Sequence, residues 1–168
     1  MSYLASPLTM AVLLLGLFNS ASVYAVLGIQ EPEEACGLMK EQGLTTRGWR
    51  DLSDDEYGCT SPYKELGVGN PLANNLAYYV TGTRTKVTEL KLVLNVNNRS
   101  AATIGHEALL KAAEVLCAKA TGAKLPKAAG NAIAAGKPVT TKVGKAAISV
   151  LRKDWPTGRG YEIHVVLQ

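Results

Sequence analysis

Alternating apolar and polar residues predict a long β-hairpin near the middle of the chain. In residues 86–97, apolar side chains occupy every second position from Leu90 to Val96, and most of the residues between them are polar. A period of two buries one face of a strand and leaves the other wet. Residues 76–82 are rich in β-forming side chains and reach this strand through a TGTRT segment, so we expect the two to pair.

The same alternation predicts three further strands at the end of the chain. We expect them at residues 138–143, 146–152 and 161–168. The first two are joined by a tight turn at Gly144-Lys145, and the third alternates its side chains like a strand with one buried face.

A helical period separates these two groups of strands. Residues 99–122 carry an apolar stripe at helical spacing, with Ser100 as the expected N-cap and Gly122 as the residue that ends the helix. Residues 125–136 predict a second, shorter helix, which Gly130 weakens.

The segment before the central hairpin is less regular. Residues 31–42 predict a short helix, with proline and acids near its start and a glycine directly after it. We expect two short strands near residues 46–50 and 56–60. Residues 60–75 show no period and are rich in Gly, Pro and Asn, so we expect a long loop, which is a kind of segment that often carries function.

The order of these elements predicts the fold class. Runs of strands separated by helices, without βαβ alternation, are typical of an α+β domain. We expect a single domain in which an antiparallel β-sheet has helices packed on one face and solvent on the other. The order also suggests two helix-plus-strands halves, residues 31–97 and 100–168, although no residue-level repeat supports a duplication.

The start of the chain has the pattern of a secretory signal peptide. An apolar run at residues 10–18 is followed by small residues, and Ala25 ends a pattern typical of a cleavage site. The run is too short for a membrane span, although no Lys or Arg precedes it. The alternatives are an uncleaved anchor and an ordinary buried helix. We expect residues 1–25 to be a signal peptide and residues 26–168 to be the mature domain, without an integral membrane span, in the bacterial periplasm or secreted.

The net charge of +4 is unevenly distributed. Residues 31–65 hold nine acids and four bases, whereas residues 115–153 hold eight bases and no acid. The basic part is a candidate face for an anionic polymer or lipid head groups; the alternative is a solvated face that balances the acidic part. The lysines are spread out without interleaved aromatic residues, so the signal for nucleic acid is weak. The candidate basic face consists of Lys124, Lys127, Lys137, Lys142 and Lys145.

The three cysteines predict one disulfide. An exported chain folds in an oxidising compartment, where structural cysteines pair. Cys36 and Cys59 lie in adjoining elements of the first half, and Cys117 lies beside the apolar stripe of the long helix. We therefore expect a Cys36–Cys59 disulfide and a buried, reduced Cys117.

No residue pattern indicates catalysis or a bound cofactor. A thiol hydrolase would need a base beside Cys59, and His106 and His164 stand in no recognisable signature. The cysteines and histidines lack zinc spacing, and the GVGN segment lacks the flanking strand and helix of a phosphate-binding loop. We therefore name no catalytic residue, no metal ligand and no cofactor.

Aromatic and polar residues on predicted loops and strands form the candidate binding surface. Trp, Tyr and Arg are favoured anchors of protein interfaces. The alternative for Trp155 is that its ring folds back over the sheet edge and caps the core. The candidates are Trp155, Arg159, Tyr63, Asn74, Asn75 and Tyr79.

These observations favour an exported, non-enzymatic binding protein that acts by contact with another protein. Inhibitors, immunity proteins and envelope-assembly factors belong to this class. The alternatives are a binder of anionic polymer or lipid head groups through the lysines, and an enzyme with an unrecognised site.

Overall fold

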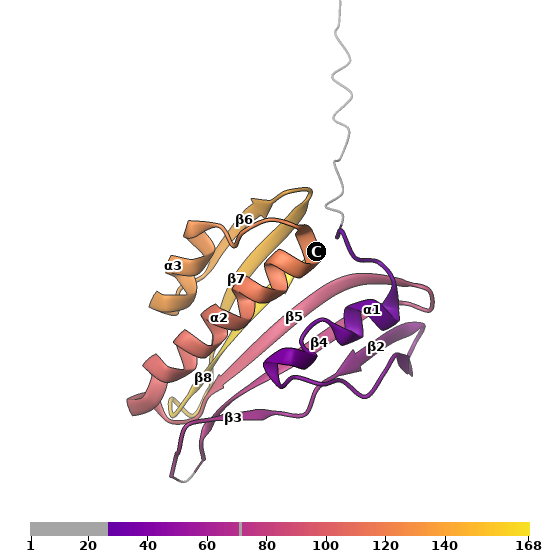
Figure 1. Cartoon of the computed structure of the whole chain (residues 1–168). Helices are drawn as coiled ribbons and strands as arrows, with labels where there is room; N and C mark the ends of the chain where they lie inside the picture. Colours follow the sequence, from indigo (N-terminus) through magenta and orange to yellow (C-terminus); the bar gives the residue numbers. More distant parts are fainter. Residues whose placement is uncertain (1–26, 71) are drawn as a thin grey trace, which may run out of the picture.

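An antiparallel sheet supports all the helices on one of its faces in the computed structural model, which describes residues 27–70 and 72–168 (Figure 1). The strands are β1 (Arg50–Ser53), β2 (Glu56–Thr60), β3 (Lys64–Leu66), β4 (Asn74–Thr83), β5 (Lys86–Val96), β6 (Val139–Val143), β7 (Ala146–Asp154) and β8 (Tyr161–Leu167). The helices are α1 (Pro32–Gly37), α2 (Ala102–Thr121) and α3 (Lys127–Ala135), with short 3₁₀ turns η1 (Lys40–Gln42) and η2 (Arg99–Ala101).

The eight strands have the order β1-β2-β4-β5-β8-β7-β6, and β3 pairs with the first part of β4 beside β2. Strands of the first half thus lie on one side of the sheet and those of the second half on the other, joined where β5 pairs with β8. The architecture is the α+β, single-domain fold with an antiparallel sheet and helices on one face that the sequence predicted.

The core lies between the sheet and the helices. Leu90, Leu92 and Leu94 of β5 point into it and are fully buried. α2 crosses above them and approaches closely at Gly105, where a Cβ would lie 3.2 Å from Cδ1 of Leu94. The absence of a side chain at this position therefore allows the helix to pack against the central strands.

A disulfide fastens α1 to the sheet. Cys36 of α1 and Cys59 of β2 are bonded, with an S–S distance of 2.01 Å and 6.1 Å between their Cα atoms. The hydroxyl of Tyr78 on β4 donates to the carbonyl oxygen of Ala35 at 2.9 Å and holds the same helix. Cys117 is buried and unpaired. The predicted pairing, with a reduced third cysteine, is therefore present in the structure.

The first strand begins later than predicted. β1 starts at Arg50 rather than near residue 46. The N–H of Arg47 already donates to the carbonyl oxygen of Thr60 on β2 at 3.2 Å, but Gly48, with a φ of 86°, interrupts the strand between Arg47 and Arg50. Asp54 and Asp55, with φ of 50° and 62°, form the tight turn that follows. Their short polar side chains tolerate this left-handed conformation better than most.

Two other segments differ from the prediction. Residues 60–75 are not one loop, because Lys64–Leu66 forms β3 and pairs with Asn74–Leu76. Residues 31–42 form α1 and η1 in succession rather than one helix, and Gly43, with a φ of 74°, ends the second.

The long helix agrees with the prediction at its C-terminus, where Gly122 has a φ of 70°. Its start differs, because Asn98 rather than Ser100 caps the chain: the side chain of Asn98 accepts a hydrogen bond from the backbone N–H of Ser100 at 3.1 Å. η2 then leads into α2.

The predicted signal peptide, residues 1–25, lies outside the described residues. Within the described part of the chain, no helix is long and apolar enough to cross a membrane.

Candidate binding surface on the open face of the sheet

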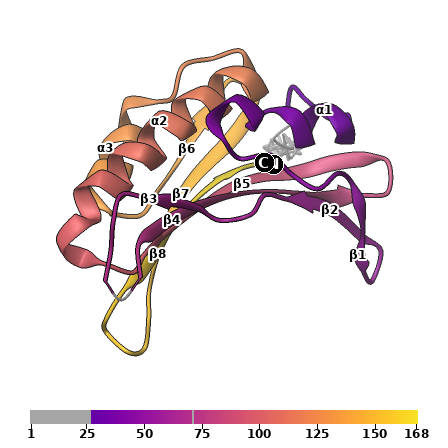
Figure 2. The ribbon, with the colours of Figure 1, turned by 60° about the horizontal axis from the view of Figure 1, so that its bottom comes forward.

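The sheet face opposite α1, α2 and α3 is covered by none of the described elements. Figure 2 shows the sheet arched beneath the helices, with the β1–β2 hairpin and the β7–β8 loop both bending toward the uncovered side. This face, called here the open face, is therefore concave and flanked at both ends by a hairpin.

Strand register determines which side chains meet on the open face. Residues directly opposite one another on neighbouring strands form rows across β4, β5, β8 and β7. The rows are Tyr79–Lys91–Val166–Ser149, Ala77–Val93–His164–Leu151, and Asn75–Asn95–Glu162–Lys153. These residues, with Tyr63 and Trp155, are called the open-face surface below.

The centre of the open-face surface is apolar and closely packed. Ala77, Val93 and Val166 are only 0%, 7% and 8% exposed although none of the described helices lies over them. Long neighbouring side chains and the curvature of the sheet shield them. Leu151, at the next strand outward, is 39% exposed and extends this apolar centre toward solvent.

A polar cluster lies at one side of this centre. The Nε1–H of Trp155 donates to the carboxylate of Glu162 at 3.3 Å, and Nε2 of His164 lies 2.6 Å from the other carboxylate oxygen. Burial raises the pKa of Glu162, but the hydrogen bonds from His164 and Trp155 and the electrostatic interaction with His164 and Lys153 outweigh it. The pKa is held below its ordinary value, so the carboxylate is ionised at neutral pH.

A pair of tyrosines lies at the other side. The hydroxyl of Tyr79 donates to that of Tyr63 at 3.2 Å, and Nζ of Lys91 lies 5.5 Å from the centre of the Tyr79 ring. Burial chiefly raises the pKa of Tyr79, and the hydrogen bond from Tyr79 to Tyr63 and the charge of Glu162 raise it further. Tyr79 is therefore a neutral hydrogen-bond donor at physiological pH.

The chain matches the model of a protein family. Residues 25–154 match the model of a family described as "Family of unknown function (DUF6030)". The chain belongs to this family. Neither a curated protein nor a solved structure matches the chain. The DUF6030 match contains Tyr63, Asn75 and Tyr79 of the open-face surface, whereas Trp155 lies just beyond it.

The structure brings four of the six predicted binding residues together on the open face of this DUF6030 chain. Tyr63 and Tyr79 are hydrogen-bonded, and Asn75 accepts a hydrogen bond from Asn95 at 2.8 Å. Trp155 is half-buried, and its ring lies on its own hairpin, where a Cβ at Gly160 would come within 2.5 Å of it. The ring thus folds back on the β7–β8 loop without entering the core between sheet and helices.

The other two candidates lie elsewhere. Arg159 is exposed in the β7–β8 loop, where its backbone N–H donates to Oγ1 of Thr157 at 3.4 Å. Asn74 is 1% exposed on the helix side, where its side chain bonds the backbone of Asn98 and Ala101. The prediction of a surface role for Asn74 is therefore wrong, because alternation along β4 turns its side chain inward.

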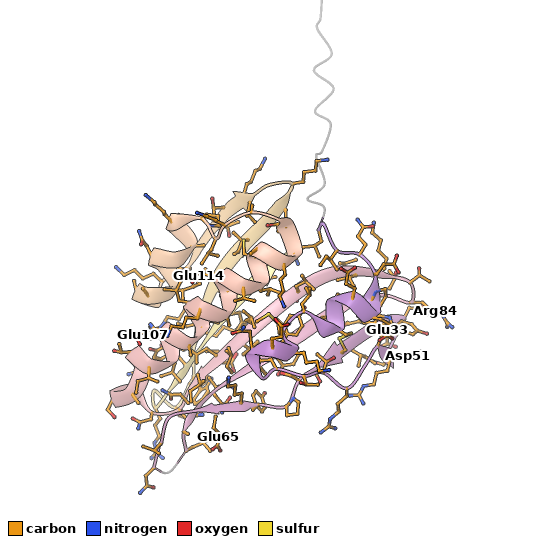
Figure 3. The ribbon with its side chains drawn as sticks, viewed as in Figure 1. Glu33, Asp51, Glu65, Arg84, Glu107 and Glu114 are labelled. Atoms are coloured by element: carbon orange, nitrogen blue, oxygen red, sulfur yellow. A yellow bond between two sulfur atoms is a disulfide. The ribbon has the colours of Figure 1, made fainter. Side chains whose placement is uncertain are left out.

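The five predicted lysines are all exposed and lie around α3 and β6. Lys124 precedes α3, Lys127 begins it, and Lys137 follows it; Lys142 is in β6, and Lys145 is in the turn after β6. Figure 3 labels two acidic residues, Glu107 and Glu114, on the neighbouring helix α2. The predicted basic residues of the DUF6030 sequence thus gather around α3 and β6, on the second-half side of the sheet.

A second polar cluster, which no sequence pattern indicated, lies under α2. Nδ1 of His106 lies 3.0 Å from the carbonyl oxygen of Ala134, and its Nε2 lies 2.9 Å from the hydroxyl of Tyr161. The Arg152 guanidinium stacks 3.8 Å from the centre of the Tyr161 ring and bonds Asp154 at 2.7 Å. These residues are distant along the chain, so no local motif could have revealed the cluster.

The His106 cluster holds α2 against α3 and β8, beside a pocket of about 300 Å³. Nδ1 faces a carbonyl, so it carries the proton and Nε2 accepts from Tyr161. With both ring nitrogens used in this way, the arrangement is structural.

We expect the Tyr161→Phe variant to lose about 1 kcal/mol of unfolding free energy, because Nε2 of His106 then loses its donor in a half-buried site. The measurement is urea unfolding at neutral pH. The matched control is Tyr63→Phe, which removes a hydroxyl from a tyrosine that is 57% exposed. Equal losses in the two variants would contradict the structural role of Tyr161.

Proposed function

We propose that the protein is an exported binding protein that acts, without catalysis, by contact of its open-face surface with another protein. The observation that carries the proposal is the open face itself: a concave sheet surface, uncovered in the described part of the chain, where dispersed aromatic residues converge. Inhibitors, immunity proteins and envelope-assembly factors act through surfaces of this kind.

The composition of the open-face surface supports a protein partner. Protein interfaces combine an apolar centre with a polar rim and favour Tyr and Trp as anchors. Here Val93, Val166 and Leu151 supply the apolar centre. Tyr63 and Trp155 supply aromatic groups beside it, with ionic side chains around them.

Two features support export. The apolar run at residues 10–18 has the pattern of a secretory signal. The Cys36–Cys59 disulfide is of a kind that persists in oxidising compartments and is rare in the reducing cytosol. Both features are consistent with a periplasmic or secreted protein.

The test starts with affinity capture from envelope and secreted fractions of the source cells, followed by titration of the purified partner. We expect Tyr63→Ala and Trp155→Ala each to weaken binding about tenfold or more, because aromatic anchors dominate interface energies. Binding should depend weakly on salt, since the centre of the surface is apolar.

The matched control is Ile104→Ala on α2, which removes a side chain that is 53% exposed on the helix side, against 57% for Tyr63. This variant should bind as the wild type does. If it weakens binding as much as Tyr63→Ala, or if high salt abolishes binding that Tyr63→Ala leaves intact, the open-face surface is not the binding site.

A further inference from the structure

β6 is the outermost strand on the second-half side of the sheet, since β7 is the only strand among the described residues that pairs with it. The two strands are joined by a two-residue turn in which Gly144 has a φ of 59°. In such a hairpin the residues that flank the turn, Val143 and Ala146, form a hydrogen-bonded pair, and every second pair along the ladder does the same. The backbone groups of Thr140 and Lys142 therefore point outward, away from β7.

The edge of β6 is strongly basic. Lys142 lies within the strand, Lys137 lies two residues before it and Lys145 two residues after it, and all three are exposed. No acid occurs between residues 115 and 153, so neither α3 nor the β6–β7 turn offers these lysines a carboxylate. Lys142 pairs with Ala147, whose small side chain leaves the ammonium group free to meet an added strand.

We propose that the edge of β6 binds an extended acidic segment of another protein, which adds to the sheet as a further strand. The outward N–H and C=O groups of Thr140 and Lys142 would bond the backbone of that segment. Acidic residues at every second position of the segment would lie on one side and meet the lysines. This inference uses residues outside the open-face surface, so each proposal can fail without the other.

Charge distinguishes the acidic segment from a second copy of this chain. Pairing two β6 edges would place Lys137, Lys142 and Lys145 against the same residues of the other copy. Like charges across paired strands are destabilising, and lysines on an edge strand prevent self-pairing. A flexible anionic polymer would also meet the lysines, but it has no N–H groups to donate to the outward backbone carbonyl oxygens, as a peptide strand has.

A matched pair of variants at Thr140 tests the role of the backbone. Thr140→Pro removes an N–H that points away from β7, so the native ladder is retained, and it places a ring where the added strand would lie. Thr140→Ala keeps the N–H, and both variants lose the hydrogen bond between Oγ1 of Thr140 and Oγ of Ser149. Circular dichroism and urea unfolding check that the two variants fold alike.

The probe is a short fluorescent peptide in which threonine and glutamate alternate, titrated by anisotropy into the full protein at low salt. We expect wild type and Thr140→Ala to bind it equally, and Thr140→Pro to bind about tenfold more weakly or not at all. Equal binding by both Thr140 variants, or no binding of the peptide to wild type, would overturn the proposal.

A second pair of variants tests charge without altering the backbone. Lys142→Glu should lose affinity for the threonine–glutamate peptide and gain affinity for a peptide of alternating threonine and lysine. Lys86→Glu makes the same change of charge at an exposed position in the first half and should bind as wild type does.

Two other results would assign the edge of β6 to a different occupant. If polyphosphate binds as tightly as the peptide and Thr140→Pro does not weaken its binding, the site is a polyanion surface. If sedimentation shows a wild-type dimer that Thr140→Pro dissociates, the occupant is a second copy; either result overturns the proposal.

Discussion

Replacement of both Cys36 and Cys59 by serine is expected to lower the free energy of unfolding by about 3 kcal/mol. The disulfide closes a loop between residues 23 positions apart. Its removal restores conformational entropy to the unfolded chain, which for a loop of this length stabilises the unfolded state by about that amount. The measurement is urea unfolding followed by circular dichroism, with wild type and the double variant compared at one pH.

Reduction provides the control for this experiment. A thiol reductant should bring wild type to the stability of the double-serine variant and leave the variant itself unchanged. Cys117 should not interfere, because its burial, which outweighs the hydrogen bond with Thr121, raises the pKa of its thiol and keeps it protonated and slow to exchange. A loss below about 1 kcal/mol would mean that the disulfide does not constrain the unfolded chain as the loop-closure model requires.

Elements whose pattern repeats over many residues could be predicted from the sequence. The alternation from Leu90 to Val96 identified β5, and the apolar stripe of residues 99–122 identified α2. The residue type alone was also sufficient to predict that α2 ends at Gly122, because few other residues adopt the left-handed conformation that ends the helix. The Cys36–Cys59 pairing followed because both cysteines lie in neighbouring elements of the first half.

Features that depend on tertiary contacts could not be predicted in this way. β3 is three residues long and is a strand only because β4 lies beside it. The contact of His106 with Tyr161 joins residues 55 positions apart. The open-face surface was predicted in part, since Tyr63 and Trp155 were chosen by residue type, but Glu162 and His164 were missed because an acid and a histidine in a strand carry no signature alone.

Asn74 is the clearest case of a residue whose role reversed, and the structure explains why. The sequence places it at the end of an apparent loop, where an asparagine is usually exposed. In the structure it begins β4 and joins that strand to the start of α2. Its Nδ2 donates to the carbonyl oxygens of Asn98 and Ala101 at 3.2 and 3.0 Å, and its Oδ1 accepts from the N–H of Asn98 at 2.8 Å.

Asn74→Asp is therefore expected to lose about 3 kcal/mol or more of unfolding free energy at pH 7. The substitution keeps the acceptor for the N–H of Asn98 but replaces the two donated hydrogen bonds by a buried carboxylate oxygen facing two carbonyls. Burial and these carbonyls raise the pKa of the new carboxyl in the folded state above its unfolded value, about 3.9. The loss should therefore grow as pH rises from that value through the folded pKa, and shrink in acid, where the protonated carboxyl can donate.

The neighbouring residue offers a control of equal charge and size. Asn75 lies half-buried on the open face, and its Oδ1 accepts a hydrogen bond from Nδ2 of Asn95 at 2.8 Å. In Asn75→Asp, a carboxylate oxygen accepts this hydrogen bond as well or better. We expect this variant to change the stability by less than about 0.5 kcal/mol at any pH between about 4 and 8. Urea unfolding of both variants across this range decides the matter: if Asn74→Asp and Asn75→Asp lose the same stability with the same pH dependence, the side chain of Asn74 does not join β4 to α2.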